Sequence, residues 1–190
     1  LDYYVLEETC RFIRKRLDEG KTVPCISVNF SRRHLEEDYL VKKIVNVIDK
    51  YGIDHGYIEI ELTESEDFQN YEIMSEIVDG LRSEGIATSI DDFGTGYSNF
   101  HYLSELHPDI VKIDRGFTSK AITDKKEYYL LNQFSNMIHN LGLKLCIEGI
   151  ETEDELQKMK LLKPDYCQGF YWGQPCLYDE FRKYFVDVKR

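Results

Sequence analysis

The stretch Tyr57-Ile58-Glu59-Ile60-Glu61-Leu62 alternates apolar and acidic side chains, which is the two-residue period of a β-strand. Successive side chains of a strand point to opposite faces, so the isoleucines would lie on one face and the glutamates on the other. Strands of a parallel sheet are usually covered on both faces and tend to be apolar throughout. Two carboxylates on one face therefore indicate a role other than packing.

Segments with strand character recur along the chain and alternate with segments in which apolar residues recur at the helical spacing. Strands are predicted over residues 25–30, 57–62, 86–91, 110–113, 143–148 and 166–168. Helices are predicted over residues 2–19, 34–51, 71–83, 126–140, 153–162 and 178–185. This alternation is typical of βα units on a parallel sheet, and no internal linker interrupts it, so residues 1–190 are predicted to form a single domain.

The number of predicted strands bounds the fold. A closed (β/α)8 barrel has eight strands and typically about 250 residues. This chain of 190 residues yields six strands. We therefore expect an α/β fold of the TIM-like barrel type that is incomplete and lacks its first two strands. An open doubly wound sheet, which tolerates six strands, is the alternative.

The other predicted strands share the two-sided pattern of residues 57–62. One face is apolar and suited to packing under helices; its residues are Ile26, Val28, Ile58, Ile60, Ile90, Val111, Ile113, Leu145 and Ile147. The other face is polar and holds Ser27, Asn29, Glu59, Glu61, Ser89, Asp91, Lys112, Asp114, Lys144, Glu148, Tyr166 and Gln168. Most of the reactive groups fall near the carboxyl ends of the strands, where α/β barrels place their chemistry.

This polar face carries more carboxylates than lysines. Any one carboxylate is readily explained as an ordinary buried ion pair, but several together are unfavourable unless cations or hydrogen bonds compensate. The excess negative charge therefore predicts bound metal, and oxygen ligands favour hard ions such as magnesium, manganese or calcium. The five histidines show no ligand spacing, which disfavours zinc, and we expect them at the surface.

The adjacent pair Asp91-Asp92 strengthens the metal prediction. Neighbouring residues of a regular strand point oppositely, so both carboxylates can serve one site only where the strand breaks into a loop. Gly94 and Gly96, which follow closely, are expected to supply that break. The run lacks the third glycine of a dinucleotide fingerprint and the Gly-Lys-Ser/Thr of a P-loop. Asp92-Phe93-Gly94 spells the kinase metal triplet, but the other kinase motifs are missing.

Composition narrows the setting in which the protein acts. A net charge of −11 argues against binding a nucleic-acid polymer, which requires Lys and Arg to displace counterions from phosphates. No apolar run approaches the roughly 18 residues needed to span a bilayer, and no secretory signal is recognisable. The five cysteines form an odd set without a C-x-x-C pair and are predicted to be buried thiols in a reducing cytoplasm.

With these residues in order, the sequence resembles the EAL family of bacterial cyclic di-GMP phosphodiesterases over essentially its whole length. The motifs that carry the resemblance are Ser27-Val28-Asn29-Phe30-Ser31, Glu59-Ile60-Glu61-Leu62-Thr63-Glu64-Ser65, the run from Asp91 to Ser98, Lys112-Ile113-Asp114-Arg115, Glu148-Gly149-Ile150-Glu151-Thr152 and Gln168-Gly169-Phe170. The resemblance implies hydrolysis of one phosphodiester bond of cyclic di-GMP to linear pGpG, in bacterial second-messenger signalling. It also implies a TIM-like barrel in which one strand is reversed.

The resemblance assigns metal ligands to Asn29, Glu61, Asp91 and Asp92. Asp91 would bridge two divalent cations, magnesium or manganese, and Asp92 would serve the second ion. Calcium is expected to inhibit.

The resemblance also assigns catalytic roles. Glu148 would act as the general base, Lys112 would hold the attacking water and the phosphate charge, and Gln168 would orient that water. A carboxylate beside a lysine and divalent cations is expected to have a depressed pKa. Glu64 would anchor the glycine-rich loop. Two further residues are assigned to the substrate: Asp114 and Glu151.

The printed sequence departs from the family pattern at its beginning. The Glu-Ala-Leu strand that names the family, and that supplies another metal ligand, is not among residues 1–190. We therefore expect a truncated domain with impaired activity, derived from a protein with an upstream sensory or GGDEF-type domain. An incomplete barrel exposes strand edges, which predicts a homodimer.

Two other functions are considered beside the phosphodiesterase. A noncatalytic cyclic di-GMP receptor would keep the ligand without turnover. An aldolase-like enzyme would use Lys112 to form a Schiff base, although a lysine among carboxylates is expected to be strongly protonated.

Overall fold

The computed structural model of the chain describes residues 1–63, 71–94, 103 and 105–181. Within these residues a single sheet is formed by β1 (Ile26–Phe30), β2 (Ile58–Thr63), β3 (Ala87–Phe93), β4 (Ile110–Ile113), β5 (Lys144–Ile147) and β6 (Tyr166–Cys167). Every neighbouring pair is parallel, and the spatial order follows the chain order from β1 to β6. The prediction of six parallel strands is confirmed, and the carboxyl ends of all six strands lie at one end of the sheet.

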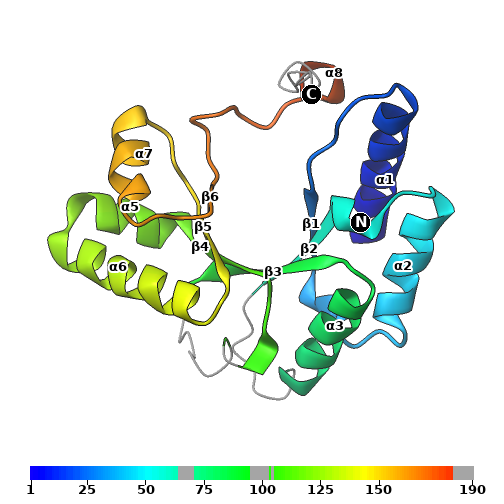
Figure 1. Cartoon of the computed structure of the whole chain (residues 1–190), viewed down its shortest axis with the longest axis horizontal. Helices are drawn as coiled ribbons and strands as arrows, with labels where there is room; N and C mark the ends of the chain where they lie inside the picture. The colour runs from blue at the N-terminus through cyan, green and yellow to red at the C-terminus, as the bar shows by residue number, and fades with distance from the viewer. Residues whose placement is uncertain (64–70, 95–102, 104, 182–190) are drawn as a thin grey trace.

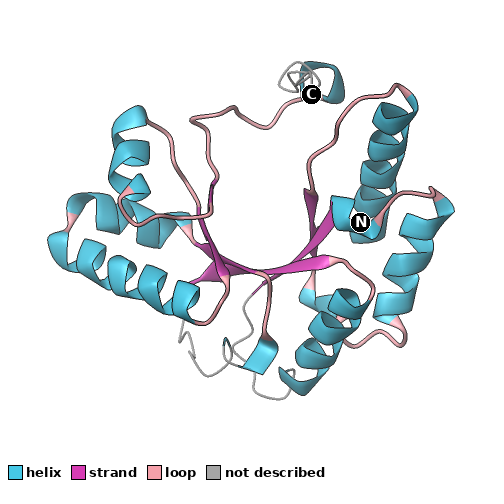
Figure 2. Cartoon of the chain, in the orientation of Figure 1, coloured by secondary structure: helices cyan, strands magenta, loops and turns pink. Residues whose placement is uncertain are grey.

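Helices connect the strands. They are α1 (Asp2–Asp18), α2 (Leu40–Lys50), α3 (Tyr71–Ser83), α5 (Arg115–Thr123), α6 (Lys125–Asn140), α7 (Glu153–Lys160) and α8 (Tyr178–Phe181), with short 3-10 turns η1 (Arg32–His34) and η2 (His55–Tyr57). The sheet is curled, and α1, α2, α3, α5, α6 and α7 lie around its convex side (Figure 1; Figure 2). A doubly wound sheet would carry helices on both faces, so the curled half-barrel confirms the incomplete TIM-like fold.

The core lies between the convex face of the sheet and the helices, as the apolar alternation predicts. Ile58 and Ile60 of β2 are completely buried, and so are Leu6 and Ile13 on the inner side of α1. Each such side chain contributes about 1.5–3 kcal/mol when it is fully removed from water. This packing fixes which face of each strand is left for polar residues.

Local sequence determines where the helices start. Thr152 forms a capping box at the start of α7, in which its hydroxyl accepts from Glu155 N and the Glu155 carboxylate accepts from Thr152 N.

The predicted start of the second helix, at His34, is wrong. His34 pairs with Asp2 of α1 and with Glu37, and α2 begins only at Leu40, after Tyr39 in a left-handed conformation (φ 63°).

One helix, α5, was not predicted from the sequence. It has nine residues, follows β4 directly and includes Gly116, so its apolar period is too short to detect. Asp114 starts it, because its carboxylate accepts a hydrogen bond from the Gly116 N–H.

The chain following β6 crosses the open side of the half-barrel (Figure 1). It leads to α8, where Phe181 packs against Phe12 of α1 with ring centroids 6.0 Å apart. The two ends of the sheet are thus linked by this crossing segment, and in the described part of the chain β1 and β6 each have one strand neighbour.

The cysteines only partly follow prediction, and none of them is in a disulfide. Cys10 and Cys146 are buried as expected, whereas Cys25 and Cys176 are exposed. The prediction is wrong for Cys25 because it directly precedes β1, which lies at the edge of the sheet. Among the helices that the structure describes, none combines the length and the apolarity needed to cross a membrane.

Candidate functional site

Lys112 of β4 stands at the centre of the polar face. Its side chain is buried, and its Nζ atom lies 2.8 Å from Glu61 Oε1, 2.7 Å from Glu148 Oε1 and 3.3 Å from Asp91 Oδ1. These carboxylates come from β2, from the residue that follows β5, and from β3. One ammonium group therefore holds together side chains from four consecutive parts of the sheet.

Strand register explains this convergence. Asn29 is paired with Glu61, and Thr63 with Asp91, so the polar residues of β1, β2 and β3 stand in adjacent rows. The Glu148 N–H donates to Ile113 O at 3.1 Å, which extends the β4–β5 ladder by one residue. Glu148 is thereby held just beyond β5, within reach of Lys112.

The pair Asp91-Asp92 is brought to one side of the sheet by an irregularity in β3. The register shifts between Ile90 and Phe93, and Asp92 has a φ of 57°. A bulge of this kind places two successive side chains where a regular strand would place one. The break begins at Asp92 itself, two residues before Gly94, whereas the sequence suggested that the glycines supply it.

The bulge completes a carboxylate cluster of Asp91, Asp92 and Glu148. Each contributes one oxygen, and these oxygens all lie within 4.8 Å of one another. Asp91 Oδ1 is buried and, among the described residues, accepts no hydrogen bond of good geometry. The Lys112 ammonium lies 3.3 Å from this oxygen but is shared with Glu61 and Glu148, so the carboxylates outnumber it. Oxygen ligands of this kind suit hard divalent ions. The donor set therefore fits a divalent metal.

The charges of the site are strongly coupled. Burial alone would lower the pKa of Lys112, but hydrogen bonds to Glu148 and Glu61 outweigh it and raise that pKa above its ordinary value. For Glu148, which is charged when deprotonated, burial has the opposite effect and raises the pKa. The Lys112 ammonium offsets this rise only in part. Lys112 alone therefore does not depress the Glu148 pKa, because desolvation is the larger effect, and the depression expected with divalent cations bound stays a prediction.

The state of Lys112 also bears on the aldolase alternative. Schiff-base chemistry needs a neutral amine, which enzymes obtain by lowering the lysine pKa. Here the pKa of Lys112 is raised, with Glu148 and Glu61 as hydrogen-bond partners. This arrangement disfavours a nucleophilic lysine.

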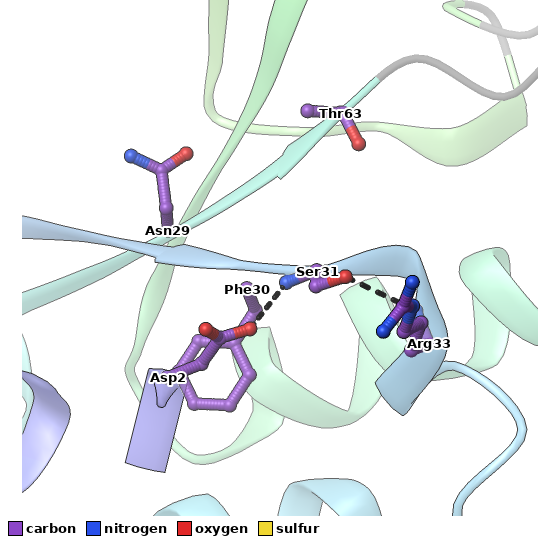
Figure 3. A pocket seen from close by; sticks show the side chains of 6 residues that line it. All are labelled: Asp2, Asn29, Phe30, Ser31, Arg33 and Thr63. Carbon is purple, nitrogen blue, oxygen red and sulfur yellow. Dashed lines mark hydrogen bonds between the residues drawn. The ribbon is translucent and has the colours of Figure 1, made fainter. Parts of the chain in front are cut away.

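Asn29 lines a pocket of about 490 Å³ next to the cluster, at the carboxyl ends of β1 and β2. Figure 3 shows Asn29 on one side of β1 and Asp2 on the other. The Asp2 carboxylate already has partners within the fold: its Oδ2 accepts a hydrogen bond from Ser31 N at 2.8 Å and lies 3.1 Å from His34 Nε2. Asn29 shares the pocket with Thr63, which the sequence reasoning did not single out, although its register with Asp91 identifies it.

Gln168 lies just after β6 and is exposed, and its backbone N–H donates to Ile147 O at 2.9 Å. It lines a second pocket, of about 460 Å³, with Lys112 and Glu59. Burial raises the pKa of Glu59. Gln168, just after β6, and Lys112, on β4, thus border one cavity.

The remaining predicted residues fall in three situations. Asp114 caps α5 through the Gly116 N–H at 2.7 Å. Glu151 forms an ion pair with Arg115. Glu64 lies outside the described residues.

The histidines lie away from the carboxylate cluster in the described part of the chain. His34, His55 and His139 are half-buried, and each contacts a carboxylate. They are therefore less exposed than predicted, since each ties two parts of the fold together, while His107 is exposed as expected.

The chain is similar to known proteins in both sequence and fold. A family model described as the EAL domain matches residues 1–175. The bifunctional diguanylate cyclase/cyclic di-GMP phosphodiesterase MucR of Pseudomonas aeruginosa is 33% identical over 172 residues, which are 90% of this chain and 25% of that protein. The chain thus spans about a quarter of the length of this curated relative.

Two solved structures are similar in fold and in sequence. A structure described as the PaMucR phosphodiesterase in complex with c-di-GMP superposes with a TM-score of 0.86 at 32% identity, covering 94% of this chain and 72% of that one. The EAL domain of Mycobacterium smegmatis DcpA superposes with a TM-score of 0.87 at 28% identity, covering 96% and 82%.

Proposed function

The chain belongs to the EAL-domain family, whose model matches residues 1–175, and from this premise we propose that it hydrolyses cyclic di-GMP to linear pGpG with the help of divalent cations. The observation that carries the proposal is the carboxylate cluster of Asp91, Asp92 and Glu148 beside the buried Lys112. The relatives support it, because MucR is named a cyclic di-GMP phosphodiesterase and its solved structure is described as a c-di-GMP complex.

In this proposal the ligands are the carboxylates of Asp91 and Asp92, with Glu61 and Asn29 in the adjacent strand rows. Two magnesium or manganese ions held by these residues would supply activation of water, neutralisation of phosphate oxygens and stabilisation of the leaving alkoxide. Asp91 Oδ1, which is buried and accepts no hydrogen bond from the described residues, supports the assignment.

The protein side chains would handle the proton and the phosphate charge. A carboxylate oxygen of Glu148 accepts the proton of the attacking water, whose oxygen bonds to phosphorus as the bond from phosphorus to the ribose 3′ oxygen breaks. The 3′ oxygen takes up a proton, which leaves a 3′ hydroxyl and a 5′ phosphate. Lys112 holds Glu148 in place at 2.7 Å and adds positive charge near the phosphate, and Gln168 orients the water.

The test is turnover of cyclic di-GMP by the chain and by a longer protein that contains it, followed by chromatography. From the longer protein we expect pGpG with manganese and none with EDTA. Glu148→Gln keeps the shape of the side chain but cannot accept the proton, so we expect loss of activity. Glu36→Gln, at an exposed glutamate, is the matched control and should leave turnover unchanged. Full activity of Glu148→Gln would refute the base assignment.

The receptor alternative shares the ligand but not the turnover. The carboxylate cluster favours the enzyme, because a pure binding site has no need for three carboxylate oxygens within 4.8 Å of one another. Calorimetric binding without pGpG formation, in the chain and in the longer protein alike, would decide for the receptor.

The parent protein is proposed to act in the bacterial cytoplasm with an upstream sensory or GGDEF-type domain. We also propose that the chain dimerises. In the described residues the outer edges of β1 and β6 pair with no strand, and unpaired edges invite association. Light scattering should give the mass of a dimer, and a monomeric mass across the micromolar range would contradict it.

A further inference from the structure

The segment from Glu148 to Glu151 connects the proposed general base to α7. It lies between two neighbours, the start of α5 on one side and the residues that follow β6 on the other. How this segment is held decides where the Glu148 carboxylate points.

On the side of β6 the segment is fixed by backbone contacts. The Ile150 N–H donates to Gln168 O at 3.1 Å, and the Tyr171 N–H donates to Ile150 O at 3.0 Å. The two backbones are so close that a Cβ at Gly169 would lie 2.1 Å from Ile150 O. Ile150 is therefore anchored on this side, and the Glu148 N–H is held by Ile113 O at 3.1 Å, so Gly149 is the residue between the two anchors.

On the side of α5 the segment meets Arg115. Gly149 has a φ of 78°, and a Cβ there would lie 2.3 Å from Arg115 Cγ and 3.0 Å from Arg115 Cα. The stem of Arg115 thus covers the backbone directly after Glu148. Its guanidinium continues along the segment and forms an ion pair with the Glu151 carboxylate. A single side chain spans from the residue after the base to the start of α7.

This ion pair is too exposed to add much to global stability, since the side chains of Arg115 and Glu151 are 58% and 39% exposed. Its effect should be local. A displacement of about 1 Å of a group that acts on the substrate can lower the rate roughly 100-fold, so a small local effect is sufficient for function.

We propose that Arg115 is a positioning residue: through its contact with Gly149 and its pair with Glu151 it holds Glu148 at the carboxylate cluster. The proposal rests on the proposed function, because it assigns Arg115 to the base of that reaction. It also gives Glu151 a role that the family resemblance does not imply, as the partner of Arg115 instead of a substrate ligand.

The test uses charge reversal in the complete chain and in a longer protein that contains it. The single variants Arg115→Glu and Glu151→Arg put like charges together, and the double variant restores a pair of opposite charges. Glutamate at position 115 is well tolerated by α5, because a negative charge suits the first turn of a helix. Arg115→Lys keeps the charge and most of the stem as the conservative control.

Two readouts are needed. Amide hydrogen exchange of residues 148–152 reports on the segment without requiring turnover. We expect faster exchange in both single variants, wild-type exchange in the double variant, and little change in Arg115→Lys. For hydrolysis of cyclic di-GMP we expect kcat to fall at least about 10-fold in the single variants while KM changes less than about 2-fold, with recovery in the double variant.

The outcomes separate the two ideas. Unchanged exchange in the single variants, or a double variant in which neither exchange nor kcat recovers, overturns the positioning role and leaves Glu151 as a substrate ligand. A wild-type chain and longer protein without turnover overturn the proposed function. In that case the exchange data alone decide whether Arg115 holds the Glu148 segment.

Discussion

Lys112 of β4 and Glu148, which directly follows β5, form an ion pair with Nζ and Oε1 2.7 Å apart. Lys112 is shared by Glu61 and Asp91, so it offsets three carboxylates at once. The Lys112 ammonium therefore stabilises the fold of this region and also serves the proposed chemistry.

Replacing Lys112 by Met should destabilise the fold by roughly 3–5 kcal/mol, because the buried Glu61 is left without its cation. Urea unfolding in EDTA measures this. Lys42→Met, at an exposed lysine, should change stability by less than about 0.5 kcal/mol. Manganese should restore part of the loss in Lys112→Met. Equal stability of the two variants would show that the carboxylates are satisfied in another way.

Asp92→Asn should weaken manganese binding by at least about 10-fold. Loss of a residue that merely hydrogen-bonds to a metal ligand typically lowers metal affinity by about 10-fold or more, and loss of a ligand should lower it at least as much. Asp92 is one of the three residues whose oxygens lie within 4.8 Å of one another. Calorimetry without substrate gives the affinity. Asp154→Asn, at an exposed aspartate of α7, is the control. An unaltered affinity in Asp92→Asn would remove this residue from the site.

Gly149 and Gly142 form a matched pair, because their φ values are 78° and 77° but their surroundings differ. A Cβ at Gly142 meets no atom within 4 Å, whereas one at Gly149 overlaps Arg115. Gly142→Ala should cost about 1–2 kcal/mol of backbone strain alone. Gly149→Ala should cost a further 1–3 kcal/mol or so from overpacking, measured by urea unfolding. Equal costs would mean that Arg115 moves aside freely.

Acid stability should depend on Glu37. A hydrogen bond from Lys43, with contributions from His34 and Tyr3, lowers the Glu37 pKa from 4.5 to about 2 against the opposing effect of burial. A carboxyl group whose pKa is lower in the folded state stabilises the fold at pH values above its unfolded-state pKa. This stabilisation is lost as the pH falls through the folded-state pKa. Between pH 4.5 and about 2, Glu37→Gln should therefore lose less stability than the wild type.

Thermal melting at several pH values checks this prediction, with Glu36→Gln as the exposed control. Parallel pH curves for Glu37→Gln and the wild type would show that the contacts among Tyr3, His34 and Lys43 do not depend on the Glu37 charge.

The sequence predicted the sheet well because alternation reports directly on which side chains are buried. β4 and α3 match at both ends, and the apolar face of β2 is buried as expected. The misses have local causes. The segment before α2 is held by the contacts of His34 with Asp2 and Glu37. Asp2 is distant in the sequence, and Glu37 lies at a spacing that is equally compatible with a helix. Cys25 is exposed because an edge strand has a neighbour on one side only.

The site was predicted as a set of polar strand ends, and the structure adds how they are grouped. Lys112 meets Glu61 and Glu148 because of strand register, which alternation alone does not fix. The roles of Asn29 and Gln168 stay predictions. Arg115 could not be singled out from its sequence neighbourhood, since its partner Glu151 lies beyond the next helix and strand.

The bulge at Asp92 has an evolutionary consequence. Asp91 faces the polar side, and Phe93 is buried in the core, so Asp92 is the one residue of β3 that interrupts the alternation there. Loss of that single codon would leave Ile90, Asp91 and Phe93 in regular succession, with the hydrophobic packing unchanged. Under the proposed function, such a deletion would remove one proposed metal ligand and leave the core of the half-barrel in place.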